Sequence, residues 1–341
     1  MDRVRKDDTE DVNPSRALHD LSPRWRIAIG IVCWLVFITW AHVQRNGTDH
    51  EDARTLRVGY LPITCHLLCP VTQAHVRAGD PAFMPVRFSS WPEMIECIKG
   101  GRIDMAFILA PIAIALRAQG IPVRVVLLGH RDGTALVVKN SGNIHGIGDL
   151  GGRRVAIPIR FSNQHLALLD LLEKNGVDRE TLTLTELPPP DMPSVLGSGA
   201  IDAYIVGEPY AAQAEAEGWG RVLVHMADAF PGFISSVLVV RDETIRERGG
   251  QVRSLIRAFL REASWIEEHR REAAGIGARA YGLPEPLLAR VLTQSGRVSY
   301  SNLIPREEEF KAMADALVRR GLLVSPPDPA DLVDTTWRTD P

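Results

Sequence analysis

A spaced motif occurs twice in this chain: Gly-x-Ile-Asp, then six residues, Pro, eight residues and Gly. The first copy spans residues 101–120 and the second spans residues 199–218, with identical internal spacing. In each copy a glycine turn precedes a short apolar run, which ends at a proline that opens an alanine-rich, helix-like stretch. Open α/β sheets bind ligands where a strand leads through a loop to a helix N-terminus. Two such units predict two similar lobes with a ligand-binding cleft between them.

The segments before each copy extend the repeat. The β-rich runs 57–63 and 154–159 each lead to a polar elbow, residues 64–66 and 160–165, and then to an apolar helical segment. The alternative is chance, since Gly, Pro and Ala are common residues. Because several identities recur at fixed spacing and in the same order of elements, we favour a true internal repeat.

Length and charge limit the classes of function. A chain of 341 residues suits about two domains. The net charge of -3, the low aromatic fraction and the absence of a long basic run argue against nucleic acid as a partner.

The N-terminus has its own character. Residues 1–24 are polar with mixed charge and are expected to form a disordered cytoplasmic tail. Residues 25–43 contain an uncharged apolar run with tryptophans near its ends, which predicts a single transmembrane anchor. Arg24 and Arg26 precede the run, so the positive-inside rule places everything after it outside the cytoplasm. A cleavable signal peptide is the alternative.

The rest of the chain divides into a linker and two lobes. Residues 44–54 form a short polar linker. We expect one lobe to combine residues 55–138 with residues 229–341, and the other to span residues 139–228. The amphipathic helices predicted after residue 252 have no equivalent in the second lobe, so they are expected to pad the first.

Several segments carry a resemblance to a known family. They are Leu56-Arg57-Val58-Gly59-Tyr60, the two Gly-x-Ile-Asp elements, Asp149-Leu150-x-Gly152-Arg153-Arg154-Val155-Ala156 and Glu208-Pro209-Tyr210. With them, residues 55–335 resemble the periplasmic solute-binding proteins of nitrate, sulfonate, taurine and thiamine-precursor ABC transporters. That resemblance implies an α/β, two-lobed type 2 periplasmic-binding-protein fold with an interlobe cleft. A transmembrane anchor and the pair Cys65 and Cys69 depart from the family pattern.

The resemblance also implies a function. The expected protein is a membrane-anchored substrate-binding component of an ABC importer, single-pass in the inner membrane with its binding domain outside the cytoplasm. It would capture a small polar, oxyanionic or organic solute, work with an ABC permease and need no cofactor. Two alternatives are an enzyme of cofactor-precursor biosynthesis on the same fold and an extracytoplasmic sensory domain.

Four elements are expected to face the cleft and bind the ligand. They are the elbow after the first strand, the helix start in the first motif copy, the second elbow, and the segment that ends the second motif copy's strand. Their candidate residues are Thr64, Cys65, His66, Ala110, Pro111, Arg160, Ser162, Asn163, Gln164, Glu208 and Tyr210. Helix N-termini favour anionic or strongly polar ligands.

Two charged candidates leave alternatives open. Arg160 offers a bidentate fork for an oxyanion and is expected to face the Cys65-His66 elbow across the cleft. It could equally be a solvated loop residue. Glu208 suits a ligand amine, a heterocycle N–H or a metal ion, but it could instead cap the helix that follows it. Asp104 and Asp202 are expected to be structural residues at strand starts.

The sequence Cys65-His66-Leu67-Leu68-Cys69 is the least ordinary chemistry in the chain. Outside the cytoplasm a disulfide between the two cysteines, or a pair of inert thiols, is the favoured interpretation. A ligand-facing or redox role and a metal site are the alternatives. Cys97 lies on an apolar helix face and is expected to be buried.

Overall fold

The computed structural model describes residues 22–47 and 55–338. It separates into two units, Met1–Arg54 and Thr55–Pro341. The predicted tail and linker lie largely outside the described residues. The described residues form one N-terminal helix and the larger unit.

The helix of the first unit, α2 (Pro23–Gly47), covers the segment predicted to be an anchor. Its large apolar side chains from Ile27 to Trp40 are exposed, as in Ile31 and Trp34. Over residues 22–47 and 55–338, no helix has both the length and the apolar character needed to cross a membrane. The predicted transmembrane span is therefore not confirmed.

The second unit contains two β-sheets. The first has the strand order β11-β4-β10-β3-β1-β2, with β10 antiparallel to both of its neighbours and β1 parallel to β2 and β3. Its strands are β1 (Leu56–Tyr60), β2 (Phe83–Arg87), β3 (Met105–Ile108), β4 (Val123–Asp132), β10 (Ile234–Arg241) and β11 (Val298–Ser299). The fully buried apolar β3 and the nearly buried β10 form its centre, as expected for strands covered on both faces.

The second sheet has the order β7-β6-β8-β5-β9, with β5 antiparallel to β8 and β9. Its strands are β5 (Thr134–Lys139), β6 (Arg154–Ile157), β7 (Thr183–Glu186), β8 (Ala203–Gly207) and β9 (Gly220–His225). Strand β5 belongs to this sheet, so the change of sheet falls at Gly133, before the lobe boundary predicted at residue 139.

The sequence repeat corresponds to a structural repeat in the two sheets. Asp104 accepts a hydrogen bond from the backbone N–H of Arg57 at 2.8 Å, and Asp202 accepts one from Arg154 at 2.9 Å. Asp104 directly precedes β3, which pairs in parallel with β1, the strand that contains Arg57. Asp202 directly precedes β8, which pairs in parallel with β6, the strand that contains Arg154. The structural role expected for both aspartates is confirmed.

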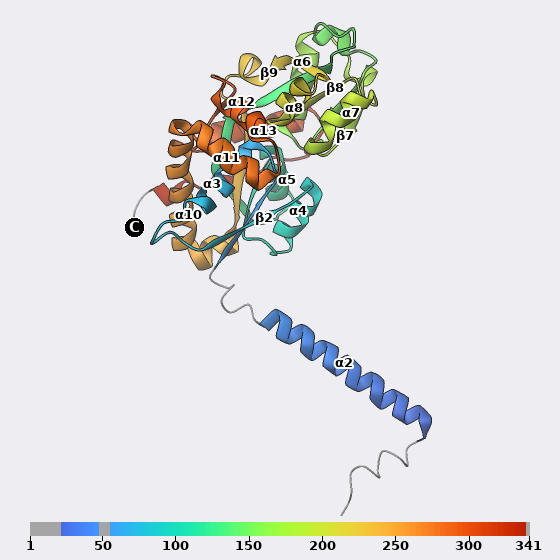
Figure 1. Cartoon of the computed structure of the whole chain (residues 1–341), viewed down its shortest axis with the longest axis vertical. Coiled ribbons are helices and arrows are strands. Elements are labelled where there is room, and N and C mark those ends of the chain that lie inside the picture. Colours follow the sequence, from blue (N-terminus) through green and yellow to red (C-terminus); the bar gives the residue numbers. More distant parts are fainter. Residues whose placement is uncertain (1–21, 48–54, 339–341) are drawn as a thin grey trace, which may run out of the picture. The chain divides into compact units, whose positions relative to one another are not determined.

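Helices cover both sheets, and Figure 1 shows α6, α7 and α8 with the second sheet's strands, and α3, α4 and α10 at the other end of the unit. The helices are α3 (Leu68–Ala74), α4 (Trp91–Lys99), α5 (Ala110–Ala118), α6 (Asn163–Lys174), α7 (Met192–Ser198), α8 (Tyr210–Ala216), α9 (Met226–Ala229), α10 (Asp242–Glu268), α11 (Arg270–Tyr281), α12 (Glu285–Thr293), α13 (Glu307–Arg319) and α14 (Pro329–Leu332). The C-terminal helices α10, α11 and α13 pack against α3 and α5, so they pad the first sheet.

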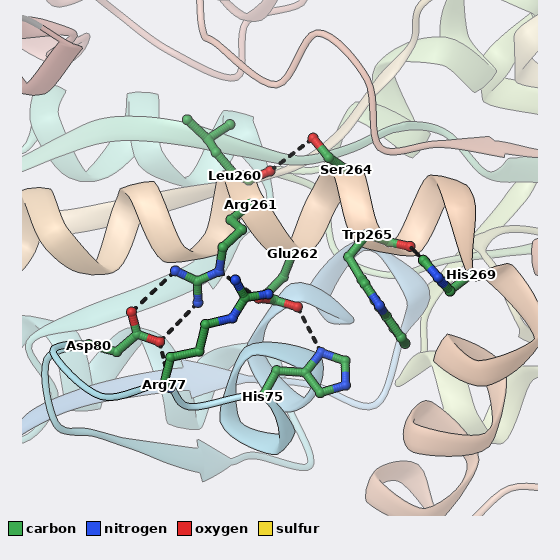
Figure 2. Close-up of polar contacts among 9 residues, drawn as sticks. All are labelled: His75, Arg77, Asp80, Leu260, Arg261, Glu262, Ser264, Trp265 and His269. Carbon is green, nitrogen blue, oxygen red and sulfur yellow. Dashed lines mark hydrogen bonds and ion pairs between the residues drawn. The ribbon is translucent and has the colours of Figure 1, made fainter.

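A polar network attaches the segment after α3 to α10 (Figure 2). The fully buried carboxylate of Glu262 bonds to His75 Nδ1 at 2.7 Å and to Arg261 Nε at 2.9 Å. Arg261 also forms two hydrogen bonds to Asp80, at 2.9 and 3.2 Å. A buried carboxylate is tolerated only when it is paired in this way, so the network fixes how α10 lies on the first sheet.

Candidate functional site

The first elbow lies directly against the residues that follow strand β8 of the second motif copy. Thr64 donates two hydrogen bonds to the carbonyl oxygen of Glu208, from its backbone N–H at 2.8 Å and from Oγ1 at 3.0 Å. The Tyr210 hydroxyl donates to the carbonyl of Pro62 at 2.9 Å. The carboxyl ends of β1 and β8, which belong to different sheets, therefore meet at one place, where α/β folds bind ligands.

The N-terminus of α6 reaches the same region from the second elbow. Ser162 is the N-cap, and its Oγ accepts from the backbone N–H of His165 at 3.1 Å. The Asn163 Nδ2 donates to the carbonyl of Ile234, the first residue of β10 in the first sheet. The Gln164 Nε2 donates to Thr134 Oγ1 at 3.3 Å, at the start of β5 in the second sheet.

These side chains define a buried polar cluster where the chain passes between the sheets, and we call it the crossing cluster. All of its members are less than 4% exposed. They are Thr64, His130, Thr134, Asn163, Gln164, Ser235 and Ser236. Two amide oxygens of the cluster, Asn163 Oδ1 and Gln164 Oε1, are buried without a hydrogen-bond partner among the described residues. Such groups usually find a partner, so the two oxygens mark a place for a ligand or an ordered water.

The sequence did not single out His130, Thr134 or the Ser235–Ser236 pair as site residues. Ser236 is the cross-strand partner of His130 and donates from Oγ to the Cys65 carbonyl at 3.1 Å. His130 Nε2 lies 3.0 Å from Thr64 Oγ1. The sequence signal that could have identified these site residues is a polar residue inside an otherwise apolar strand, near the point where two strands end.

Glu208 is held by the protein itself. Arg297 Nε donates to Glu208 Oε1 at 2.6 Å, and both side chains are at most 2% exposed. Glu208 Oε2 accepts from the backbone N–H of Ala212 at 3.1 Å, which is the helix-capping role considered for it. Burial raises the pKa of Glu208, and the positive charge of Arg297 opposes that rise. Both oxygens of this carboxylate are therefore engaged within the protein.

Arg160 lies away from the crossing cluster. Its side chain is 71% exposed and its Nε is 3.5 Å from Glu186 Oε1. The elbow that it was expected to face, Cys65-His66, is fully buried. Its guanidinium forms a surface ion pair here, and its fork toward a ligand stays a prediction.

The cysteines near the first elbow are free buried thiols, and no disulfide joins Cys65 to Cys69. Burial raises the pKa of Cys65 to about 11, against the opposing effect of the Ser236 and Ser235 hydroxyls, and burial also raises the pKa of Cys69. The elbow fits closely under β4, because a side chain at Gly129 would lie 2.1 Å from the Cys65 carbonyl oxygen. Both thiols are thus protonated at neutral pH and weakly reactive.

His66 is a packed core residue. Its Nδ1 accepts from the backbone N–H of Leu61 at 2.8 Å, and its ring packs against Trp91 and Phe107. Burial lowers the pKa of His66 well below its usual value. Among the described residues no group of three or more His, Cys, Asp or Glu side chains is placed to hold a metal ion.

The remaining candidates are backbone or packing elements. Ala110 and Pro111 form the buried first turn of α5, after Leu109 at the end of β3. Tyr210 is buried and its hydroxyl donates to the Pro62 carbonyl, just before the first elbow, so it joins the two halves. Of the predicted site residues, Thr64, Asn163 and Gln164 are those whose polar side chains lie in the crossing cluster.

Solved structures share this architecture. The periplasmic nitrate-binding protein NrtA of Synechocystis PCC 6803 superimposes with a TM-score of 0.76 at 16% identity, covering 84% of this chain and 87% of that one. The desulfurization enzyme DSZB superimposes with a TM-score of 0.59 at 18% identity, covering 83% of this chain and 97% of that one. The larger unit is therefore an α/β protein with the two-sheet fold of the periplasmic binding proteins.

The sequence comparison identifies the family more closely. The NMT1-like family model matches residues 49–278, and the chain belongs to that family. A protein of Bacillus subtilis (strain 168) named for binding aliphatic sulfonates is 25% identical over 323 residues, 90% of this chain and 94% of its own length. The nitrate import ATP-binding protein NrtC of Synechocystis sp. is 27% identical over 245 residues, 66% of this chain. The matching region spans only 37% of the length of NrtC.

The buried ion pair generates a stability prediction. Arg297→Met leaves the Glu208 carboxylate buried without its cation, and we expect a loss of about 3–5 kcal/mol in the free energy of unfolding, measured by urea denaturation. Adding Glu208→Gln to this variant should recover most of the lost free energy of unfolding. The same change at the exposed pair, Arg160→Met, should cost less than about 1 kcal/mol. Equal losses for the two single variants would contradict a buried, desolvated pair.

The buried histidines generate a pH prediction. Burial lowers the pKa of His66 and lowers that of His130 to about 3, whereas an unfolded histidine titrates near about 6.5. The unfolded chain therefore binds more protons, so stability is present above about pH 6.5 and is lost as the pH falls toward about 3. Each histidine should contribute a slope of up to about 1.4 kcal/mol per pH unit in this window.

A variant isolates one of these protons. His66→Asn keeps an acceptor for the Leu61 N–H and removes the titration, so the slope of unfolding free energy against pH should decrease by up to one proton. His145→Asn makes the same replacement at an exposed histidine and serves as the control. An unchanged slope in His66→Asn would show that this ring titrates alike in both states.

Proposed function

We propose that this protein is the substrate-binding component of an ABC importer, which captures a small polar solute between the two sheet-based halves and delivers it to a membrane permease. The family and its nitrate- and sulfonate-related members support the assignment. The observation that carries it is the crossing cluster, where Asn163 Oδ1 and Gln164 Oε1 are buried without partners between the two sheets.

Those two oxygens also suggest how a ligand drives closure. A buried polar atom without a partner costs about 1–3 kcal/mol, so the closed arrangement is penalised until a ligand provides hydrogen bonds. Opening would instead expose the crossing cluster to water. A ligand that binds only between the halves therefore shifts the equilibrium toward the closed form by its differential affinity for it.

The two lobes that would move relative to each other correspond to the two sheets. One lobe comprises residues 55–132 with 234–338, the other comprises residues 134–233, and the cleft lies where the carboxyl ends of β1 and β8 meet. The connections at Gly133 and Phe233 would act as the hinge. Besides the two amide oxygens, the backbone N–H groups of Ala110, Asn163 and Gln164 at the starts of α5 and α6 are available to a ligand, because helix starts leave them without intrahelical acceptors. Pro111 has no N–H, and the N–H groups of Ile112 and His165 are bonded to the Leu109 carbonyl and to Ser162 Oγ.

An enzymatic role on the same fold is less well supported by this site. The fold is shared with a desulfurization enzyme, and Cys65 with His66 would be the nucleophile and base. However, the pKa of the Cys65 thiol is raised to about 11, and the Nδ1 of His66 is occupied by the Leu61 N–H. We therefore propose a binding protein rather than a catalyst.

A screen of the full chain tests the function. Nitrate, bicarbonate, ethanesulfonate, taurine and small pyrimidines are compared by thermal shift, and a true ligand at about 100 times its dissociation constant should stabilise the fold by about 2.7 kcal/mol. Asn163→Leu and Gln164→Leu should each weaken binding by about tenfold, the equivalent of one hydrogen bond. Unchanged affinity in both variants would place the ligand site elsewhere.

Membrane attachment through α2 is the second part of the proposal. Its support is the run of exposed apolar side chains that includes Ile31, Trp34 and Phe37, with Arg24 and Arg26 before it. We expect a reporter that is active only outside the cytoplasm to be active when fused after Thr55 and inactive when fused after Asp20. Activity at Asp20, or inactivity at both sites, would overturn this anchoring and orientation.

A further inference from the structure

The orientation of the Asn163 carboxamide is fixed by its own contacts. Its Nδ2 donates to the carbonyl oxygen of Ile234, and a carbonyl can only accept. The nitrogen must therefore lie on that side, and Oδ1 is left as an acceptor on the other. The residue is 3% exposed, and Oδ1 has no partner among the described residues.

Asn163 stands at the first position of the 12-residue helix α6, after the N-cap Ser162. Its neighbour Gln164 also presents an unpartnered oxygen when its Nε2 donates to Thr134. An anion could use the first-turn N–H groups of this helix, but it would also meet one or two amide oxygens. Lone pairs facing an anion repel it, and they stay unpaired if the anion carries no proton.

Among the described residues, no buried cationic side chain is free to offset this effect. Arg297 is the one buried Arg or Lys within residues 55–338. Its guanidinium is engaged by Glu208, by Gln294 at 2.8 Å and by Glu215 at 3.1 Å. The electrostatic character of the crossing cluster is thus set by neutral amides and hydroxyls.

We propose that Asn163 is a specificity-determining residue that selects ligands carrying an N–H or O–H donor. Resting on the proposed function, this inference names the ligand class: small polar molecules that donate a hydrogen bond to Asn163 Oδ1 while accepting from the α6 N-terminus. Nitrate and unsubstituted alkanesulfonates carry no donor, so they are rejected. A site that holds an unpaired polar group discriminates strongly against an analogue that lacks the matching group.

Matched ligand pairs test the selection. Bicarbonate and nitrate are planar monoanions of similar size, and only bicarbonate carries an O–H. Taurine and ethanesulfonate differ by one ammonium group. Isothermal titration of the full chain with each member, at mildly alkaline pH, should show at least about tenfold tighter binding of the donor-bearing member in one or both pairs, the equivalent of one hydrogen bond.

A matched pair of variants assigns the effect to Asn163. Asn163→Leu keeps the branched shape but removes the acceptor, so the preference within a pair should fall toward unity. Asn175→Leu makes the same change at the exposed opposite end of α6 and should keep the wild-type preference. Circular dichroism melting of both variants reports on folding, and Asn163→Ser provides a second replacement if the leucine variant is unfolded.

The possible outcomes distinguish ligand selection by Asn163 from the solute-binding function itself. Equal binding within the pairs, or tighter binding of nitrate or ethanesulfonate, would overturn the selection by Asn163 while leaving the solute-binding function in place. A donor preference that survives in Asn163→Leu and Asn163→Ser would also overturn it. Absence of binding by every member of the wider thermal-shift panel to the folded wild-type chain would remove the proposed function and this inference together.

Discussion

The arrangement of the whole second unit depends on the connection at Gly133. Strand β4 of the first sheet passes into β5 of the second through this single residue, which has a positive φ of 68°. A side chain there would lie 2.6 Å from the His130 ring, so glycine is required for both conformation and space. The Asp132 N–H donates to the Phe233 carbonyl at 2.6 Å, and Asp132 Oδ1 accepts from the Phe233 N–H at 3.1 Å. The two connections between the sheets are thereby held together.

Because the crossing is fixed, the internal repeat places equivalent parts opposite each other. Asp104 and Asp202 bond to Arg57 and Arg154, which sets the parallel pairing of β3 with β1 and of β8 with β6. The two sheets then share one order, since β4-β10-β3-β1-β2 corresponds to β9-β5-β8-β6-β7. In each sheet, one strand pairs antiparallel with the motif strand: β10 with β3 and β5 with β8. Along the chain, each of these two strands follows a strand of the other sheet. The carboxyl ends of β1 and β8 meet at this crossing, where Thr64 bonds to the Glu208 carbonyl.

The sequence predicted those features that depend on local pattern. Identical spacing indicated the two halves, and the β-rich runs 57–63 and 154–159 overlap the observed strands β1 and β6. The roles of Glu208 and Arg160 could not be obtained in this way, because they depend on partners 89 and 26 residues away in the chain. Likewise, His130 and Ser235 become site residues only when β4 and β10 pair across more than 100 positions. Strand β5 pairs within the second sheet although residues 134–138 were predicted in the first lobe, because Asp132-Gly133 fits equally well a turn between two strands of one sheet.

The crossing region combines two solutions to the burial of polar groups. Glu208 and Arg297 satisfy each other, so their pair adds rigidity at the cost of desolvating two charges. Asn163 and Gln164, in contrast, each use their nitrogen inside the protein and leave their oxygen unpaired. A fold selected for stability alone would satisfy those oxygens internally, as it does for Glu208. Asn163 is bonded to the first sheet and Gln164 to the second, so the two unpaired acceptors belong to side chains that already connect both sheets to the start of α6.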